Sequence, residues 1–149
     1  MRYAICNETF DGWDHARVCD TVAGLGYTGL EVAPFTLAPR ITDVTAARRA
    51  ELRRRAEAAG VTLLGLHWLL VSPKGLSITS RDEAVRAETS RYLTALADFC
   101  ADMGGKILVL GSPAQRRIPD GDAAADAADR LLQALAPAVE RCEKHGLTL

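Results

Sequence analysis

The side chains best suited to chemistry in this sequence stand where short apolar runs end. Six residues occupy such places: Glu31, His67, Trp68, Ser112, Gln115 and Arg116. A carboxylate inside an apolar run, as Glu31 is in GLEVAP, is costly to bury unless it meets a cation or a polar ligand. A histidine after an apolar run, as His67 is after LLGL, can bind a metal, move a proton or hydrogen-bond a substrate. We therefore treat the six as candidate functional residues.

The other candidates supply shape and positive charge. Trp68 can form an apolar wall, and the Gly-Ser-Pro turn after the run ILVL lets the backbone approach a ligand closely. Arg116 or Arg117 can reach carboxylate, hydroxyl or phosphate oxygens. Asn7 and Glu8 follow the first apolar run, but a loop carboxylate is more often solvated. Residue types and positions thus point to a functional site at the ends of the apolar runs, and they leave the role of each side chain open.

One unit recurs along the chain and sets the positions of these residues. A helix end, a glycine and a strand follow one another at 24–32, 58–67, 103–112 and 144–149. The expected strands are 2–6, 29–32, 61–66 and 106–110, with a fifth beginning at 147. They are continuously apolar, as parallel strands that are covered on both faces require.

Helical patterns lie between these strands. Apolar residues spaced by three and four predict helices over 12–25, 45–59, 80–103 and 122–145. Ser80 and Glu83 match the capping-box pattern, so we expect the third helix to begin at Ser80.

Strict alternation of strands and helices predicts a parallel sheet, either doubly wound or closed into a barrel. The first turn, CNETFDG, has bulky residues where a nucleotide-binding sheet needs glycines. The long connections follow strands two to four, which is the habit of a (β/α)8 TIM barrel. Because a whole barrel needs roughly 250 residues, we expect an incomplete one. Residues 1–149 would form a single N-terminal half, with four βα units and the start of strand five.

Composition narrows the classes of partner. The 149 residues carry 18 Lys and Arg against 19 Asp and Glu, a formal net charge of −1, which disfavours nucleic acid and anionic membranes. The sequence does not open with a charged segment followed by an apolar one, as a secretion signal does, and it has no apolar run long enough to span a membrane. We therefore expect neither secretion nor a membrane span. The four cysteines are far apart and lie in apolar patterns, so we expect reduced thiols and a cytoplasmic protein.

Three stretches resemble the xylose-isomerase-like TIM barrel superfamily of sugar phosphate isomerases and epimerases. They are GYTGLEV (26–32), LLGLHWLL (63–70) and LVLGSPAQRRIPDG (108–121). The resemblance implies a divalent metal (Mn, Mg, Co or Zn) held by residues of strands five to eight, beyond Leu149. It also implies two glutamates that move a proton next to the carbonyl of a sugar or sugar phosphate. On this chain the resemblance implies only a wall of the substrate pocket. Glu31 belongs to it by position, and five residues belong to it by motif: His67, Trp68, Ser112, Gln115 and Arg116.

Two other interpretations remain open. The zinc apurinic endonucleases share this plan and have a zinc-binding histidine at the end of strand three, the place of His67. Strand four opposes this reading, because Gly111 and Ser112 stand where that branch has a histidine. The second is a non-catalytic half-barrel that assembles with a partner or with itself as a homo-oligomer. For the isolated chain we expect no activity.

Overall fold

The apolar runs form strands and the periodic stretches form helices in the computed structural model, which describes residues 1–149. The strands are β1 (Ala4–Cys6), β2 (Gly29–Val32), β3 (Thr62–His67) and β4 (Ile107–Val109). The α-helices are α1 (His15–Gly24), α2 (Ala46–Ala58), α3 (Glu83–Asp102) and α4 (Ala124–His145). Short 3-10 helices are η1 (Asn7–Phe10), η2 (Pro34–Thr36), η3 (Ile41–Asp43) and η4 (Pro113–Arg116).

The four strands form one parallel sheet in the order β1-β2-β3-β4. Cys6 pairs with Glu31, and His67 pairs with Val109. Beyond β4, Thr148 makes a single parallel bridge to Ile107. The sequential parallel order that the repeated unit predicts is therefore confirmed. Thr148 lies beside β4, at the place of a fifth strand.

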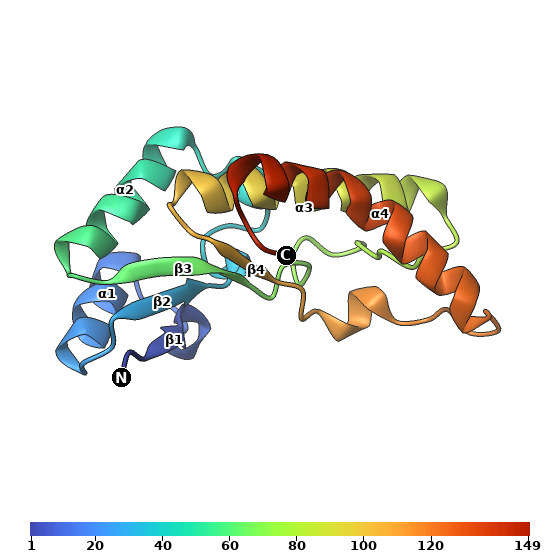
Figure 1. Ribbon diagram of the computed structural model, residues 1–149. Helices are drawn as coiled ribbons and strands as arrows, with labels where there is room; N and C mark the ends of the chain where they lie inside the picture. The colour runs from blue at the N-terminus through green and yellow to red at the C-terminus, as the bar shows by residue number, and fades with distance from the viewer.

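The helices cover one face of this sheet. Figure 1 shows α2, α3 and α4 on one side, while no helix lies against the other side of β3 and β4. Strand residues that point toward the helices are buried in the core: Leu30, Val32, Leu63, Leu66 and Leu108. Residues on the opposite side are only partly covered. We call this side the open face: Ala4, Cys6, Glu31, Leu64, His67, Ile107 and Val109. The architecture is that of half a TIM barrel. Helices cover the face that is outside in a barrel, and the open face corresponds to the barrel interior.

Helix termini follow local side-chain chemistry. The side chains of Asp14 and Thr45 accept hydrogen bonds from the first-turn N–H groups of α1 and α2. The third helix begins later than the capping-box pattern predicts: Asp82 caps it by accepting from Ala84 N, at 2.8 Å, and Ser80 instead accepts from Asp82 N. The expectation for Ser80 is wrong because the nearer Asp82 carboxylate meets the free N–H groups. α4 ends at Gly146, whose φ of 63° is the left-handed conformation that favours glycine.

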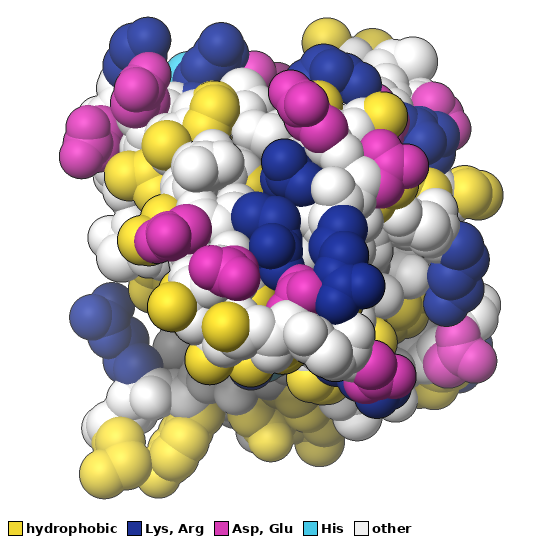
Figure 2. Space-filling model, turned by 90° about the vertical axis from the view of Figure 1, so that its right-hand side faces the viewer, with side chains coloured by type: hydrophobic (Ala, Val, Ile, Leu, Met, Phe, Trp, Pro, Cys, Tyr) yellow, Lys and Arg dark blue, Asp and Glu magenta, His cyan; other side chains and the backbone are white.

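Charged side chains of both signs cover the loops at the C-terminal ends of the strands. Figure 2 views this side and shows Lys and Arg side chains near its centre, acidic side chains around them, and hydrophobic side chains along the lower margin. Two loops are tied together here, because Asp122 forms ion pairs with both Arg81 and Arg130. None of the helices is both long enough and apolar enough to cross a membrane.

Candidate functional site

Glu31 and His67 meet on the open face, where β2 and β3 end. Nδ1 of His67 lies 3.0 Å from Oε2 of Glu31. About a third of each side chain is exposed, at 30% for His67 and 29% for Glu31. An ionised carboxylate only accepts hydrogen bonds, so Nδ1 carries the proton and donates it. This leaves Nε2 of His67 able to accept a proton or a hydrogen bond from a ligand.

Trp68 stands beside this pair in a strained conformation. Its φ of 57° lies in the left-handed region, which is unfavourable for a bulky residue. Its ring centroid is 5.4 Å from that of His67. The indole reaches the backbone of Gly111, where a Cβ would lie 3.6 Å from Trp68 Cε3 and 3.8 Å from His67 Nε2. Both rings therefore lie against the backbone of Gly111 at the end of β4.

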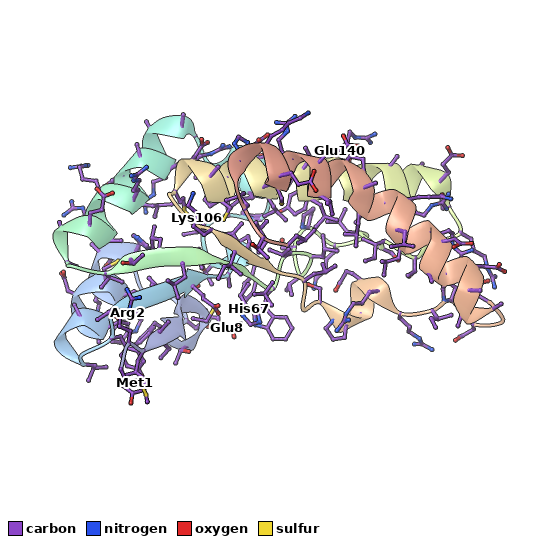
Figure 3. The ribbon with its side chains drawn as sticks, viewed as in Figure 1. Met1, Arg2, Glu8, His67, Lys106 and Glu140 are labelled. Carbon is purple, nitrogen blue, oxygen red and sulfur yellow. The ribbon has the colours of Figure 1, made fainter.

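Cys6 and Glu8 also lie at this end of the sheet, and neither was among the six candidates. Burial raises the pKa of the Cys6 thiol, and the nearby carboxylates of Glu8 and Glu31 raise it further. Figure 3 shows Glu8 and His67 at the same end of the sheet, on the side away from α3 and α4. Cys6 could have been found from its register, because it pairs with Glu31 in the adjacent strand. The thiol is a poor nucleophile here, so its contribution is to shape and polarity.

Asn7 holds the ends of the first two strands together. It is buried, and its amide nitrogen donates to Thr36 Oγ1 at 2.7 Å while its oxygen accepts from Ala33 N at 2.8 Å. These bonds satisfy both ends of the amide group. Asn7 therefore positions the loop after β2.

The three residues after β4 lie in different surroundings. Ser112 is buried, and its Oγ accepts from Leu70 N at 3.0 Å, which ties the loop after β4 to the loop after β3. Gln115 is half-buried and has no side-chain hydrogen bond, while its carbonyl accepts from Ile78 N. Arg116 is exposed, and its Nε donates to Gly111 O at 2.9 Å. Only Gln115 and the free end of Arg116 have groups available to a ligand, so a substrate-binding role for all three stays a prediction.

The donor set of this chain does not form a metal centre. No group of three or more His, Cys, Asp or Glu side chains is placed to hold a metal ion. Glu31 and His67 supply two donors, whereas structural and catalytic sites take at least three from the protein. The residues of this chain therefore do not by themselves form a site for a divalent metal.

Comparison with known families matches the sequence over residues 19–149 to the family described as xylose isomerase-like TIM barrel. No curated protein is significantly similar to the chain in sequence.

Several solved structures share the fold. A D-psicose 3-epimerase crystallised in the presence of D-fructose superposes with a TM-score of 0.76 and 18% identity, covering 99% of this chain and 50% of its own. An L-ribulose 3-epimerase gives a TM-score of 0.76 and 21% identity over 99% of this chain and 48% of its own. The D-psicose 3-epimerase of Clostridium cellulolyticum H10 with D-tagatose gives 0.71 and 16%, over 99% and 50%. The chain thus spans about half the length of the structures it matches, and it has the fold of that half.

Proposed function

Since the chain belongs to the xylose isomerase-like TIM barrel family, we propose that it forms one wall of the substrate site of a sugar isomerase or epimerase. The observation that carries this proposal is the pair of Glu31 and His67, held 3.0 Å apart at the C-terminal ends of β2 and β3. In a TIM barrel this end of the strands is where substrates bind. The matched epimerases, which are named for ketoses, support the substrate class.

In this proposal Glu31 acts on His67, and His67 acts on the sugar. The carboxylate fixes the imidazole orientation and keeps the proton on Nδ1. Nε2 then accepts a hydrogen bond from a sugar hydroxyl, which fixes the position of the carbon atoms beside the carbonyl. Trp68 offers its ring face to the apolar C–H side of the sugar. A divalent metal would polarise the carbonyl, and it would be held by side chains other than those of this chain.

The charges at this wall favour an unphosphorylated ketose. Glu8 and Glu31 both bring negative charge to the end of the sheet, as their effect on Cys6 shows. Arg116 is the only cation among the six candidates, but it is exposed and its Nε donates to Gly111 O. A phosphate dianion would therefore meet like charges without a buried cation to offset them.

The test follows proton exchange in a full-length barrel that contains residues 1–149. With D-fructose or D-tagatose in D2O, proton NMR should show loss of the signal from the C–H proton on the carbon next to the carbonyl. His67→Gln and Glu31→Gln should each slow this exchange by about 100-fold, the order of effect that a misplaced substrate has. D-Fructose 6-phosphate should exchange more slowly than D-fructose.

A matched control lies elsewhere in the chain. His145 Nε2 is 2.7 Å from Asp98 Oδ1, so α3 and α4 carry a similar carboxylate–imidazole pair, remote from the ends of the strands. His145→Gln and Asp98→Asn should leave exchange unchanged. Equal effects at both pairs would show that the Glu31–His67 pair serves stability and would overturn the proposed role.

A further inference from the structure

Trp68 is held in a conformation that costs the protein stability. Its φ of 57° lies in the left-handed region, where the Cβ of an ordinary residue crowds the following carbonyl oxygen. Its indole Nε1 is buried and has no hydrogen-bond partner among residues 1–149, which adds the cost of an unpaired donor. Strain of this kind persists where neighbouring contacts over-determine the backbone, and it collects at functional sites. The contacts around residue 68 therefore bear on function.

The backbone is fixed on both sides of Trp68. Before it, His67 is the last residue of β3 and pairs with Val109 of β4. After it, Leu69 and Leu70 are fully buried in the core. Residue 68 is therefore the single link between the end of the sheet and a segment that is anchored in the core.

Ser112 fixes the position of that anchored segment. It is 1% exposed, and its Oγ accepts a hydrogen bond from Leu70 N at 3.0 Å. Ser112 directly follows Gly111, against which the indole of Trp68 lies, because a Cβ on Gly111 would be 3.6 Å from Cε3 of the ring. The start of the loop after β4 thus contacts the ring of Trp68 and also fixes the backbone two residues beyond it.

We infer that Ser112 is a positioning residue of the sugar site, an inference that rests on the function proposed above. Its hydroxyl keeps residue 68 in the left-handed conformation. This conformation sets the indole beside the imidazole of His67, with the ring centroids 5.4 Å apart and the planes tilted by 37°. Ser112 does not contact the sugar, because it is buried. The ring face of Trp68 binds substrate and transition state alike, so its loss raises KM and leaves kcat nearly unchanged.

The test measures proton exchange at increasing concentrations of D-fructose in a full-length barrel that contains residues 1–149, which separates KM from kcat. Trp68→Ala should raise KM about tenfold, as expected for the loss of one aromatic contact. Ser112→Ala should raise KM by no more than that. Because Ser112 acts through the indole, the double variant should have the KM of Trp68→Ala alone. Effects on KM that multiply would overturn the inference, because Ser112 would then act independently of Trp68.

Thr89 provides the matched control. It is buried, and its Oγ1 accepts a hydrogen bond from Ser77 N at 3.0 Å, so it ties a later part of the same loop to α3. Thr89→Val removes this acceptor and should lower the melting temperature as Ser112→Ala does, with KM unchanged. An equal rise in KM from Thr89→Val would overturn the inference, because any loosening of the loop would then have the same effect.

The backbone strain is tested without the sugar. Trp68→Gly and Trp68→Ala both remove the ring, but glycine accepts the left-handed conformation, so Trp68→Gly should melt about 2 °C higher than Trp68→Ala. Equal melting temperatures would overturn the inference, because residue 68 would then hold no strain. If Ser112→Ala fails to fold, Ser112→Cys takes its place in the double variant, since sulfur is only a weak acceptor. An unsubstituted barrel that exchanges no proton on any ketose would overturn the proposed function, and the sugar role of Ser112 would fall with it. Normal exchange with multiplying effects on KM would overturn this inference alone.

Discussion

Two carboxylate–histidine pairs in this molecule have similar separations, although the carboxylate contacts Nδ1 of His67 and Nε2 of His145. Glu31 and His67 are 3.0 Å apart, and Asp98 and His145 are 2.7 Å apart, with similar exposure of the four side chains. The second pair lies between α3 and α4, where Arg141 also donates to Asp98 with two short bonds. The pair itself therefore does not mark a functional site. What distinguishes the first pair is its position at the ends of two parallel strands, beside a strained tryptophan.

His67→Ala should separate activity from stability. The side chain is partly exposed on the open face and contributes little to the core, so the melting temperature of a full-length barrel should fall by no more than about 4 °C. Proton exchange on a ketose should still be lost. Thermal unfolding followed by circular dichroism, compared with NMR exchange rates, checks both parts. A large fall in melting temperature with proportionate loss of activity would contradict the prediction.

His15 should make stability depend on pH. Burial lowers its pKa below the ordinary value of 6.5, with Arg48 acting in the same direction and Asp14 and Glu51 opposing. The folded state therefore binds fewer protons than the unfolded state between the two pKa values. The stability that neutral His15 contributes is complete above pH 6.5 and is lost as the pH falls toward the folded pKa. Urea unfolding at pH 7.5 and at successively lower pH should show this loss, and His15→Phe should reduce it.

At the scale of elements, the backbones of β3 and β4 approach each other closely at Gly65. A Cβ at Gly65 would lie 1.7 Å from Ile107 O and 2.9 Å from Ile107 N, so the two strands meet where no side chain fits. Gly65→Ala should therefore destabilise the protein by at least about 2 kcal/mol, because backbone must move. Gly24→Ala is the control, since it lies at the end of α1 with open space around it and should be neutral or slightly stabilising. Equal effects in urea unfolding would show that β4 adjusts freely.

A buried hydroxyl joins the loops after β3 and β4. Ser112→Ala removes the acceptor of Leu70 N, and this buried donor then has no partner. The expected loss is about 1–3 kcal/mol in free energy of unfolding. Amide hydrogen exchange at Leu70 should accelerate more than exchange at residues of α2. An unchanged exchange rate at Leu70 would show that water replaces the hydroxyl without cost.

The elements were more predictable from sequence than the contacts between them. Apolar runs and glycines place all four strands and their order, because parallel strands covered by helices require those residues locally. Glu31 and His67 could be placed at strand ends for the same reason. Three buried hydrogen bonds join residues far apart in sequence: Asn7 to Thr36, Leu70 to Ser112, and His15 to Leu52. No local pattern encodes such contacts, and the cap at Asp82 shows that even a local pattern has competitors.

At the scale of the whole molecule, the sheet is covered on one side only. The core lies between the strands and the helices, whereas Ile107 on the open face is 44% exposed. β1 has a neighbour on one side, and beyond β4 there is a single bridge from Thr148. The chain matches about half the length of solved epimerase structures, so in a closed barrel other strands would cover this face.

Residues 1–149 expressed by themselves should therefore self-associate or aggregate. Each 100 Å² of apolar surface left in water forfeits about 2.5 kcal/mol, so a few hundred Å² is comparable to the whole stability of a typical domain. The unpaired N–H and C=O groups of β1 add an edge that pairs readily with another chain. Sedimentation should show concentration-dependent association, which Ile107→Lys should weaken by placing a charge on the open face. A compact monomer with a cooperative thermal transition would contradict this, because it would mean that the helices alone stabilise a sheet with one face in water.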